Sequence, residues 1–480
     1  MHDDARSSVR MKLVAPGATS APAAFARAQQ LDALGRNDEA KQAYLDVLQL
    51  DPDHFEALTA LAALATKMGL RSAARAALTR AAQSHPHRAL GHANLAIQLS
   101  DAGELAAARE HFETALRLEP DSRAAHRGMA ILLLRLGETE AAKRHGRTGF
   151  GGLADPWPFR GQGRPVTVLL VLSAVGPNAP VELFMDDRVF RKWTVAPEFF
   201  DPASELPSHD LVFNGVGDPD RCGAALDGAD AIVARSKAPV LNAPGRIRDT
   251  GRVENARRLE RIPGVVTPRI ARWSRDALSA PSAESALARA GFPFPVLLRS
   301  PGFHGGELFV KVDEPRALPQ AVAGLPGDTL FVMQFVDTRG PDGKLRKYRA
   351  MMVDGRLYPL HLAVSSHWKV HYFTADMADR PDHRAEDEAF LGDMPAALGP
   401  QATQTLERLH AELALDYGGI DFAVDAAGQV VVFEANAAMA VPPPLGADKW
   451  RYRDAPVARI TRAVQTMLLR AAGRALDGEG

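Results

Sequence analysis

The chain has 480 residues, of which 46% are hydrophobic and 24% are charged, a composition that fits a globular protein of about two to four domains. Its formal net charge of −1 argues against a general attraction to nucleic acid or to an anionic membrane surface. The single cysteine, Cys222, excludes an internal disulfide framework and is compatible with a reducing compartment.

The N-terminal residues and the apolar runs bear on where the protein works. Residues 1–22 carry early acidic side chains and no apolar core, so they do not fit a secretory signal and are predicted to form a disordered tail. The longest apolar run, at 166–172, is far too short to span a bilayer and indicates a buried strand. We therefore expect a cytoplasmic protein with neither nucleic acid nor membrane as a partner.

The first third of the chain repeats itself every 34 residues. Glycine, alanine, proline and large apolar residues all keep this period, at Gly35, Gly69, Gly103 and Gly137; Ala28, Ala62, Ala96 and Ala130; Ala40, Ala74, Ala108 and Ala142; Pro52, Pro86 and Pro120; and Tyr44, Leu78 and Phe112. Glycine ends one helix, alanine allows close helix crossing, and proline closes a second helix. Each unit is therefore predicted to be a pair of helices.

This pattern resembles the tetratricopeptide repeat over residues 23–146, with three full units and a truncated fourth. The resemblance implies an all-α solenoid whose concave groove binds a peptide, a protein or a carrier. Nothing in the sequence identifies that partner. Formation of a homodimer, or anchoring to a larger complex, is the alternative use of such an array.

The composition and the hydrophobic pattern of the sequence change after the repeats. A stretch rich in glycine and proline at 147–164 is predicted to be a linker. Buried-strand patterns at 165–172, 209–216 and 238–244 then predict a small α/β domain of parallel strands over 165–245. Residues 246–475 mix strands and helices in an α+β pattern. The expected fold class is thus multidomain: a solenoid, an α/β domain and an α+β domain.

The stretch YGGIDFAVDAAGQVVVFEANAAMAVPPP, at 417–444, places polar residues on two alternating strands. A two-residue turn at Ala427 and Gly428 would set Asp421 opposite Glu434, with Asn436 on the same face. Like charges that face each other destabilise a sheet. Two carboxylates and an amide oxygen suit Mg²⁺ whose shell is completed by phosphates. An exposed acidic hairpin in a shifted register is the alternative.

Two upstream segments add parts of a phosphate and base site. Arg299 ends a predicted strand, and the loop after it contains three glycines that would let backbone N–H groups approach phosphates: Gly302, Gly305 and Gly306. The apolar strand at 329–337 is interrupted by Gln334, and such a strand can bond a flat base through its main chain. An ordinary hairpin and an ordinary core strand are the alternatives.

A third segment adds cations. The run at 345–359 is predicted to be a hairpin with Asp354 and Gly355 as its turn. Lys347 and Arg349 alternate onto one face of this hairpin beside two methionines, which an anion at that face would explain. A solvated sheet face is the alternative.

In this order the segments resemble the ATP-grasp superfamily, which includes glutathione synthetases and D-alanine–D-alanine ligases. The resemblance covers about 165–475 and is strongest over 295–444, and the acid, Glu-x-Asn ending is its most specific part. It implies that Asp421, Glu434 and Asn436 hold Mg²⁺ ions that bridge the phosphates of ATP.

The same resemblance implies roles for the other segments. Arg299 would contact phosphate, and Gly305 and Gly306 would belong to a loop that covers the phosphates. Gln334, Phe335 and Val336 would form the adenine hinge, and Arg349 would lie near the transferred phosphate. Relatives usually carry lysine where this chain has Arg299, and a second, upstream lysine is missing. One of three arginines would replace it: Arg248, Arg252 or Arg257.

The segment PLHLAVSSHWKVHYFTADM, at 359–377, lies between the cationic hairpin and the acidic hairpin. His361 and Lys369 are hypothesised to face an acyl phosphate or to bind a substrate carboxylate, and a structural role is the alternative for each histidine. Carboxylates suited to a zinc site are absent nearby in the sequence.

These features predict an ATP-dependent ligase that joins a carboxylate to an amine through an acyl phosphate. ATP and Mg²⁺ would be required, and the two substrates would be small molecules or peptides that the sequence does not identify. Two alternatives remain: a scaffold whose C-terminal part is a degenerate nucleotide sensor, and an ATP-grasp kinase that stops at the phosphorylated product. The repeat array is hypothesised to recruit a macromolecular substrate or carrier.

Overall fold

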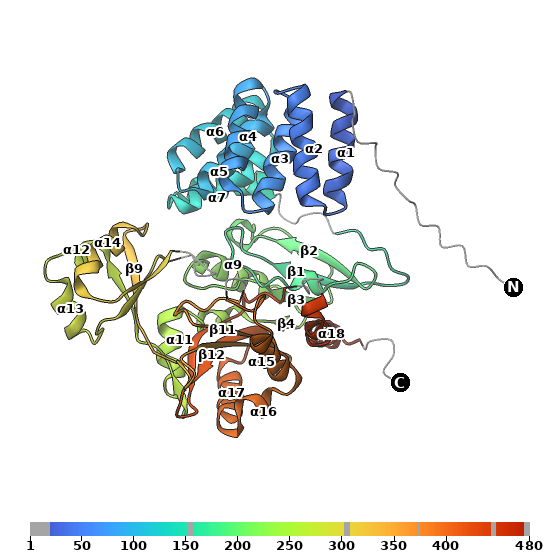
Figure 1. Cartoon of the computed structure of the whole chain (residues 1–480). Coiled ribbons are helices and arrows are strands. Elements are labelled where there is room, and N and C mark those ends of the chain that lie inside the picture. The colour runs from blue at the N-terminus through green and yellow to red at the C-terminus, as the bar shows by residue number, and fades with distance from the viewer. Residues whose placement is uncertain (1–19, 151–156, 302–307, 373–374, 443–447, 475–480) are drawn as a thin grey trace. The chain divides into compact units, whose positions relative to one another are not determined.

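The computed structural model describes residues 20–150, 157–301, 308–372, 375–442 and 448–474. The chain divides into two compact units, one ending at Gly151 and the other beginning at Gly152 (Figure 1). Each unit is described by itself.

The first unit is built from helices alone. Among its described residues, eight helices follow one another in four antiparallel pairs: α1 (Ala21–Ala33), α2 (Asn37–Leu50), α3 (Phe55–Lys67), α4 (Arg71–Ser84), α5 (Ala89–Asp101), α6 (Leu105–Leu118), α7 (Arg123–Arg135) and α8 (Thr139–Phe150). The predicted tail at 1–22 lies outside the described residues up to residue 19, and its last two residues already belong to α1.

The periodic glycines have the backbone conformation, and the periodic alanines the burial, that the sequence predicts. The four repeat glycines all have positive φ, and at Gly35 the backbone closes the helix with a bond from Arg36 N to Leu31 O of 3.0 Å. The periodic alanines are buried, as are Tyr44, Leu78 and Phe112. The all-α solenoid predicted from the 34-residue period is thereby confirmed.

The fourth repeat is longer than expected. Instead of a truncated unit followed by a linker at residue 147, α8 continues to Phe150. Gly149 explains this, because a Cβ there would lie 2.6 Å from the backbone nitrogen of Arg127 on α7. The glycine is a site of close helix approach rather than a sign of a flexible segment.

The last part of the predicted linker contacts the second unit. Residues 151–156 lie outside the described residues. Beyond them, Trp157 N donates to Lys192 O over 3.0 Å and Arg160 N donates to Asp187 O over 2.9 Å. The segment from Trp157 to Arg160 is therefore attached to the second unit.

The second unit begins with the predicted parallel sheet. Its strand order is β2-β1-β3-β4, and the strands are β1 (Val166–Val171), β2 (Phe190–Val195), β3 (Leu211–Asn214) and β4 (Val240–Leu241). The sequence pattern located β1, β3 and β4 but missed β2, whose sequence FRKWTV mixes charged and apolar residues. The strand order changes direction between β1 and β3, and ligands bind at such points in open α/β sheets.

A second sheet holds the two hairpins that the sequence singled out. Its order is β11-β10-β12-β13-β5, with β5 (Val265–Val266), β10 (Leu345–Val353), β11 (Arg356–Ser365), β12 (Tyr417–Val424) and β13 (Val430–Asn436). A third sheet, β6-β9-β7-β8, comprises β6 (Ile270–Ser274), β7 (Val296–Arg299), β8 (Phe309–Val312) and β9 (Thr329–Gln334).

Helices cover these sheets. The α-helices of the second unit are α9 (Gly223–Val233), α10 (Pro244–Arg248), α11 (Arg252–Leu259), α12 (Arg275–Ser279), α13 (Ala283–Arg289), α14 (Leu318–Ala323), α15 (Pro381–Gly392), α16 (Met394–Leu398), α17 (Pro400–Leu413) and α18 (Asp454–Ala471). Short 3-10 helices lie at Val181–Phe184, Pro197–Phe199, Pro315–Ala317 and Asp448–Arg453.

One hydrophobic core joins the first two sheets. Ile460 and Val464 of α18 pack in a cluster that contains Val168 of β1 and Met351 of β10. A buried asparagine, Asn242, reinforces the junction: its side chain accepts from Tyr417 N over 2.9 Å and donates to Tyr417 O over 2.8 Å. The end of β4 is thus fixed beside the start of β12.

The close packing of α7 against α6 gives a prediction about stability. A Cβ at Gly128 would overlap the ring of Phe112, whereas a Cβ at Gly91 would meet Phe55 Cε2 at a tight but adjustable 3.1 Å. Both Gly→Ala changes gain about 1 kcal/mol of helix propensity. Overpacking costs about 1–3 kcal/mol, so Gly128→Ala should lower the free energy of unfolding while Gly91→Ala should leave it nearly unchanged. Urea denaturation of the full chain measures both, and equal stability of the two variants would contradict the packing.

Candidate functional site

Four of the residues singled out from the sequence lie in one row across the second sheet. Strand pairing sets His361 beside Arg349, Arg349 beside Asp421, and Asp421 beside Glu434. Residues paired directly across neighbouring strands project from the same face of a sheet. The row thus contains two candidate catalytic residues and two candidate metal ligands.

Asp421 was predicted to face Glu434, and it does, although the turn and the strand register between them differ from the prediction. The turn has three residues between Asp425 and Gln429, with Gly428 at φ 75°, instead of the expected two. A β-bulge at Phe433 then restores the pairing of Asp421 with Glu434. Bulges of this kind re-aim side chains next to functional sites.

Asp421 is the most buried charge of the row. Its side chain is 1% exposed, and its two oxygens accept from Lys347 Nζ at 2.6 Å and from Arg349 Nε and Nη2 at 2.5 and 2.8 Å. Burial opposes ionisation of this carboxyl, but the two cations outweigh it, so the pKa of Asp421 lies far below its usual range. Asp421 is therefore ionised and holds both cations in place.

Glu434 and Asn436 form the other part of the predicted metal set. Arg252 Nη2 lies 2.8 Å from Glu434 Oε1, and Asn436 Nδ2 donates to the same oxygen over 3.0 Å. The amide oxygen of Asn436 accepts from Ala438 N over 2.9 Å. Glu434 is 23% exposed at its side chain, so it is more accessible than Asp421.

The donor chemistry of these residues fits a hard divalent cation. Two carboxylates and an amide supply only oxygen ligands, which Mg²⁺ prefers, and Mg²⁺ usually needs few protein ligands when phosphates complete its shell. Within the described part of the chain, no group of three or more His, Cys, Asp or Glu side chains is arranged to hold a metal. Glu434 and Asn436 are the accessible donors, because both oxygens of Asp421 are engaged by cations.

A cleft opens between the second and third sheets beside this row. Six cationic side chains and two carboxylates line it among the described residues: Arg252, Arg299, Arg346, Lys347, Arg349 and Lys369, with Asp421 and Glu434. This excess of positive charge favours a polyanionic ligand. Burial of Arg299, helped by the nearby charge of Arg252, lowers the pKa of its guanidinium to about 10. Arg299 therefore remains charged at neutral pH.

Apolar side chains also line the cleft. Phe335 and Val336 line it together with Met333, Phe309 and Trp368. Gln334 also lines it, but its backbone N–H donates to Arg269 O over 2.8 Å and its side chain accepts from Arg269 N over 3.3 Å. The cleft thus combines apolar and aromatic side chains suited to a flat ring with cationic side chains suited to phosphates.

The structure distinguishes the three upstream arginines. Arg248 pairs with Asp227 at 2.8 Å and with Asp230 at 2.6 Å, on α9. Arg257 is exposed and lines a separate cavity beside β6. Arg252 alone of the three lines the cleft, where it pairs with Glu434. It is therefore the arginine placed to act on a ligand there.

The prediction for His361 requires correction. It was expected to face a ligand together with Lys369, and Lys369 does line the cleft. His361 is instead 6% exposed and is not among the residues that line the cleft, with its ring 4.6 Å from that of Tyr372. Burial and the neighbouring Arg349 hold the pKa of His361 well below its ordinary value, so the ring is neutral. His371 lines the cleft in its place.

The structure does not describe the predicted glycine loop. Gly302, Gly305 and Gly306 lie outside the described residues, so the prediction that they cover phosphates stays a prediction.

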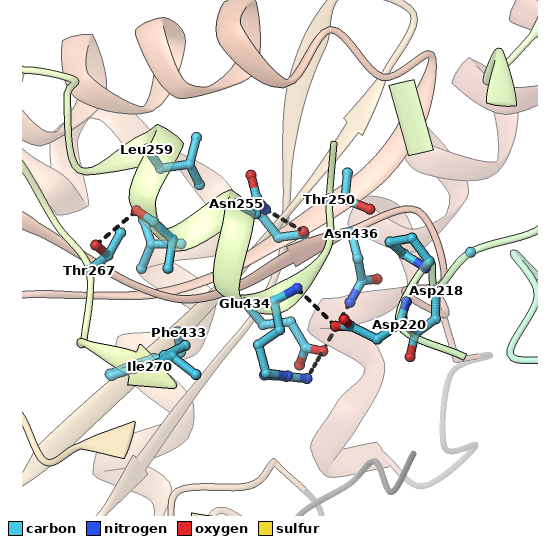
Figure 2. A pocket seen from close by; sticks show the side chains of 16 residues that line it. Asp218, Asp220, Thr250, Asn255, Leu259, Thr267, Ile270, Phe433, Glu434 and Asn436 are labelled. Atoms are coloured by element: carbon cyan, nitrogen blue, oxygen red, sulfur yellow. Dashed lines mark hydrogen bonds and ion pairs between the residues drawn. The ribbon is translucent and has the colours of Figure 1, made fainter. Parts of the chain in front are cut away.

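A second, smaller cavity adjoins the cleft (Figure 2). The loop at 217–220 after β3, helix α11 and the end of β13 line it, and Asp218, Asp220, Glu434 and Asn436 surround it. It shares Arg252, Phe433 and Glu434 with the cleft, so the Arg252–Glu434 pair stands between the two spaces. Sequence reasoning missed Asp218 and Asp220, although their position at the carboxyl end of a buried parallel strand is a known signal for ligand sites.

Comparisons with known proteins identify the repeats. Models of the tetratricopeptide repeat match residues 21–54 and 99–145, both inside the eight-helix array. The resemblance stated for this part of the chain is confirmed, and such repeats suggest a protein-interaction scaffold role. A search of curated proteins found no match to the chain.

Several solved structures are similar to about a quarter of the chain. MamA from Desulfovibrio magneticus RS-1 is 20% identical over 28% of this chain and 75% of its own, with a TM-score of 0.26. PilF of Pseudomonas aeruginosa is 24% identical over 28% of this chain and 60% of its own, also with a TM-score of 0.26.

In the described parts of the chain, none of the helices combines the length and the apolar character needed to cross a bilayer.

Removal of the central carboxylate should be costly. Asp421→Asn leaves Lys347 and Arg349 without their buried counter-charge, so we expect a loss of about 3–5 kcal/mol in the free energy of unfolding. Asp342→Asn is the matched control, because Asp342 also pairs with an arginine of β10 but at an exposed site. Urea denaturation at neutral pH measures both. A similar small loss in the two variants would contradict a central role for Asp421.

A second prediction concerns pH. Asp387 of α15 is fully buried and accepts from Leu362 N and Tyr452 Oη, each over 2.7 Å, and burial raises its pKa to about 6. Its unfolded pKa is about 3.9. Between these values the folded state binds more protons, so the free energy of unfolding should fall as pH rises from about 4 to 6.

Asp387→Asn removes this titration. The stability difference between wild type and Asp387→Asn should shift by on the order of 2 kcal/mol between pH 4.5 and pH 7, with the wild type relatively more stable at the lower pH. Urea denaturation at both pH values measures it, and a pH-independent difference would show that Asp387 does not titrate in this range.

Proposed function

We propose that the second unit binds ATP with Mg²⁺ and works as a carboxylate–amine ligase, to which the repeat array delivers a macromolecular substrate or carrier. One observation carries this proposal: a single cleft joins an apolar, aromatic wall to six cations and ends at Asp421 and Glu434. The resemblance of 165–475 to ATP-grasp enzymes supports the same reading.

The cleft residues divide the work of binding a nucleotide. Phe335 and Val336 are placed to hold the base, a role that the backbone N–H of Gln334 does not share because it is bonded to Arg269. Arg299 and Arg252 are placed to neutralise phosphate charge. Glu434 and Asn436, backed by Asp421, would hold Mg²⁺, which would supply further positive charge at the phosphate oxygens.

Arg349 is suited to stabilise charge during transfer. Its guanidinium is fixed by two hydrogen bonds to Asp421 and still lines the cleft with 21% of its side chain exposed. A cation held in advance costs no reorganisation when charge develops on a transferred phosphoryl group. Lys369 and His371 line the same cleft.

We take the reaction type from the resemblance to ATP-grasp enzymes. In such a ligase ATP transfers a phosphoryl group to a substrate carboxylate and forms an acyl phosphate. An amine would then displace phosphate from the acyl phosphate and leave an amide. This assignment of substrates rests on the resemblance, as does the distinction from a kinase.

A scaffold with a nucleotide-sensing module is the second candidate. It is favoured by the tetratricopeptide matches and by the burial of Arg299, which is 8% exposed where relatives carry a flexible lysine. The products separate the candidates. Mass spectrometry of the full chain with ATP, Mg²⁺ and cell extract should show ADP and a new amide. ADP with a phosphorylated product would indicate a kinase, and bound ATP without ADP would indicate a sensor.

Binding itself gives a direct prediction. Calorimetry on the full chain should detect ATP binding that requires Mg²⁺ and weakens at least about tenfold, or 1.4 kcal/mol, in Glu434→Gln. Glu407→Gln, at an exposed position on α17, is the control and should bind as the wild type does. Unchanged affinity in Glu434→Gln would remove the metal assignment.

Recruitment by the array can be tested without truncation. Leu90 and Ile97 of α5 are 50% and 40% exposed and lie seven residues apart, on one face of the helix. Changing both to Glu should raise the KM for the true substrate while leaving background ATP hydrolysis unchanged. Leu50→Glu, at the exposed end of α2, is the control. Unchanged kinetics in the α5 variant would contradict recruitment through this surface.

A further inference from the structure

The last two repeats contain a pair of histidines that the first two lack. In the third repeat His92 of α5 faces His111 of α6, with 3.0 Å between their Nδ1 atoms. In the fourth repeat His126 of α7 faces His145 of α8, with 2.9 Å between their Nδ1 atoms. Each histidine of the second pair follows its counterpart by one 34-residue period. The second repeat has Leu58 and Ala77 at these positions, and the first has Ala24 and Ala43.

The hydrogen bonds fix the tautomer of one ring in each pair. His92 Nε2 lies 3.1 Å from Pro86 O, and His126 Nε2 lies 2.8 Å from Pro120 O. A carbonyl oxygen can only accept, so each Nε2 carries the hydrogen. In the neutral ring Nδ1 then has a free lone pair, and that lone pair faces the Nδ1 of the partner histidine.

This arrangement is the usual support of a metal-binding histidine. A ligating imidazole commonly donates its second N–H to a backbone carbonyl, which fixes its tautomer and orientation. The repeat prolines provide that carbonyl twice, at equivalent positions. Burial, with the neighbouring imidazole as the second cause, lowers the pKa of His111 and of His145, which favours the neutral form of these two rings.

The spacing of the nitrogens favours a particular class of ion. Imidazole nitrogens bind metals at about 2.0–2.1 Å. Two such nitrogens at a right angle, as in the tetragonal geometry of Cu²⁺ and Ni²⁺, lie about 2.9 Å apart, whereas a tetrahedral ion separates them by about 3.4 Å. The observed 3.0 and 2.9 Å are hydrogen-bond distances that equal the right-angle separation, so an ion of this class would replace the shared hydrogen without moving the helices.

We propose that each of the last two repeats binds a divalent transition-metal ion of the Cu²⁺ or Ni²⁺ class between the imidazoles of its two helices. No described group of three His, Cys, Asp or Glu side chains is arranged around a metal, so each pair supplies two ligands and water completes the shell. The ion would tie the two helices of the repeat together and stabilise the C-terminal half of the array.

The two sites should differ in affinity. His111 lies near Glu110, whose negative charge favours a cation, whereas His145 lies near Arg144, whose positive charge opposes one. The site in the third repeat should therefore bind more tightly than the site in the fourth.

Titration of the full chain with Cu²⁺ tests the proposal. Electron paramagnetic resonance should show two bound ions with nitrogen ligands beyond any background sites. His92→Leu and His126→Leu should each lose one ion, and the double variant should lose both. Leucine is the residue that the second repeat has at this position, so the helix packing should tolerate it. His87→Gln, at an exposed site, is the control and should keep both ions.

The single variants also test the order of affinity, because His126→Leu retains the third-repeat site and should bind its remaining ion more tightly than His92→Leu does. Bound Cu²⁺ should raise the Tm of the wild type more than that of the double variant. Should a leucine variant fail to fold, His111→Ala and His145→Ala, which reproduce Ala77 of the second repeat, take its place. Equal Cu²⁺ binding by the wild type and the folded double variant would overturn the proposal and leave the pairs as hydrogen bonds alone.

Discussion

The burial of Asp421 is the constraint on which the candidate site depends. An ionised carboxylate that is 1% exposed is costly unless its charge is matched, and Lys347 and Arg349 match it from the neighbouring strand. The three charges therefore fix one another. Because Arg349 is paired with both Asp421 and His361 in the sheet, the same constraint sets the register of the whole row from β11 to β13. The cleft thus presents cations whose positions do not depend on a ligand.

The neighbouring parallel sheet adds the smaller cavity beside the cleft at this row. The side chain of Asn242 bonds both the N–H and the carbonyl of Tyr417. These two bonds fix the carboxyl end of β4 beside the β12–β13 hairpin. The loop after β3 and the start of α11 then meet Glu434. The ion pair between Arg252 and Glu434 lies where the cleft and the smaller cavity adjoin. A change at this pair would alter the lining of both spaces.

The repeat array follows a different physical logic. Its order comes from local contacts repeated every 34 residues, with small buried alanines between helices and glycines that end them. Its polar pairs are also local: the histidines of each of the last two repeats bridge the two helices of the same unit. The surfaces of the array are therefore set by contacts between neighbouring repeats.

The sequence by itself determined what is local or periodic. The 34-residue period predicted the solenoid, and strand alternation predicted that Asp421 faces Glu434, although a longer turn and a bulge at Phe433 replaced the expected turn. Only the tertiary structure decided what depends on distant parts of the chain. It selected Arg252 over its two neighbours, because that choice rests on contact with Glu434, 182 residues away. It also buried His361, because periodicity shows which face of a strand a residue occupies but not whether that face is covered. The segments that cover such a face come from distant parts of the chain, so no short sequence pattern encodes its burial.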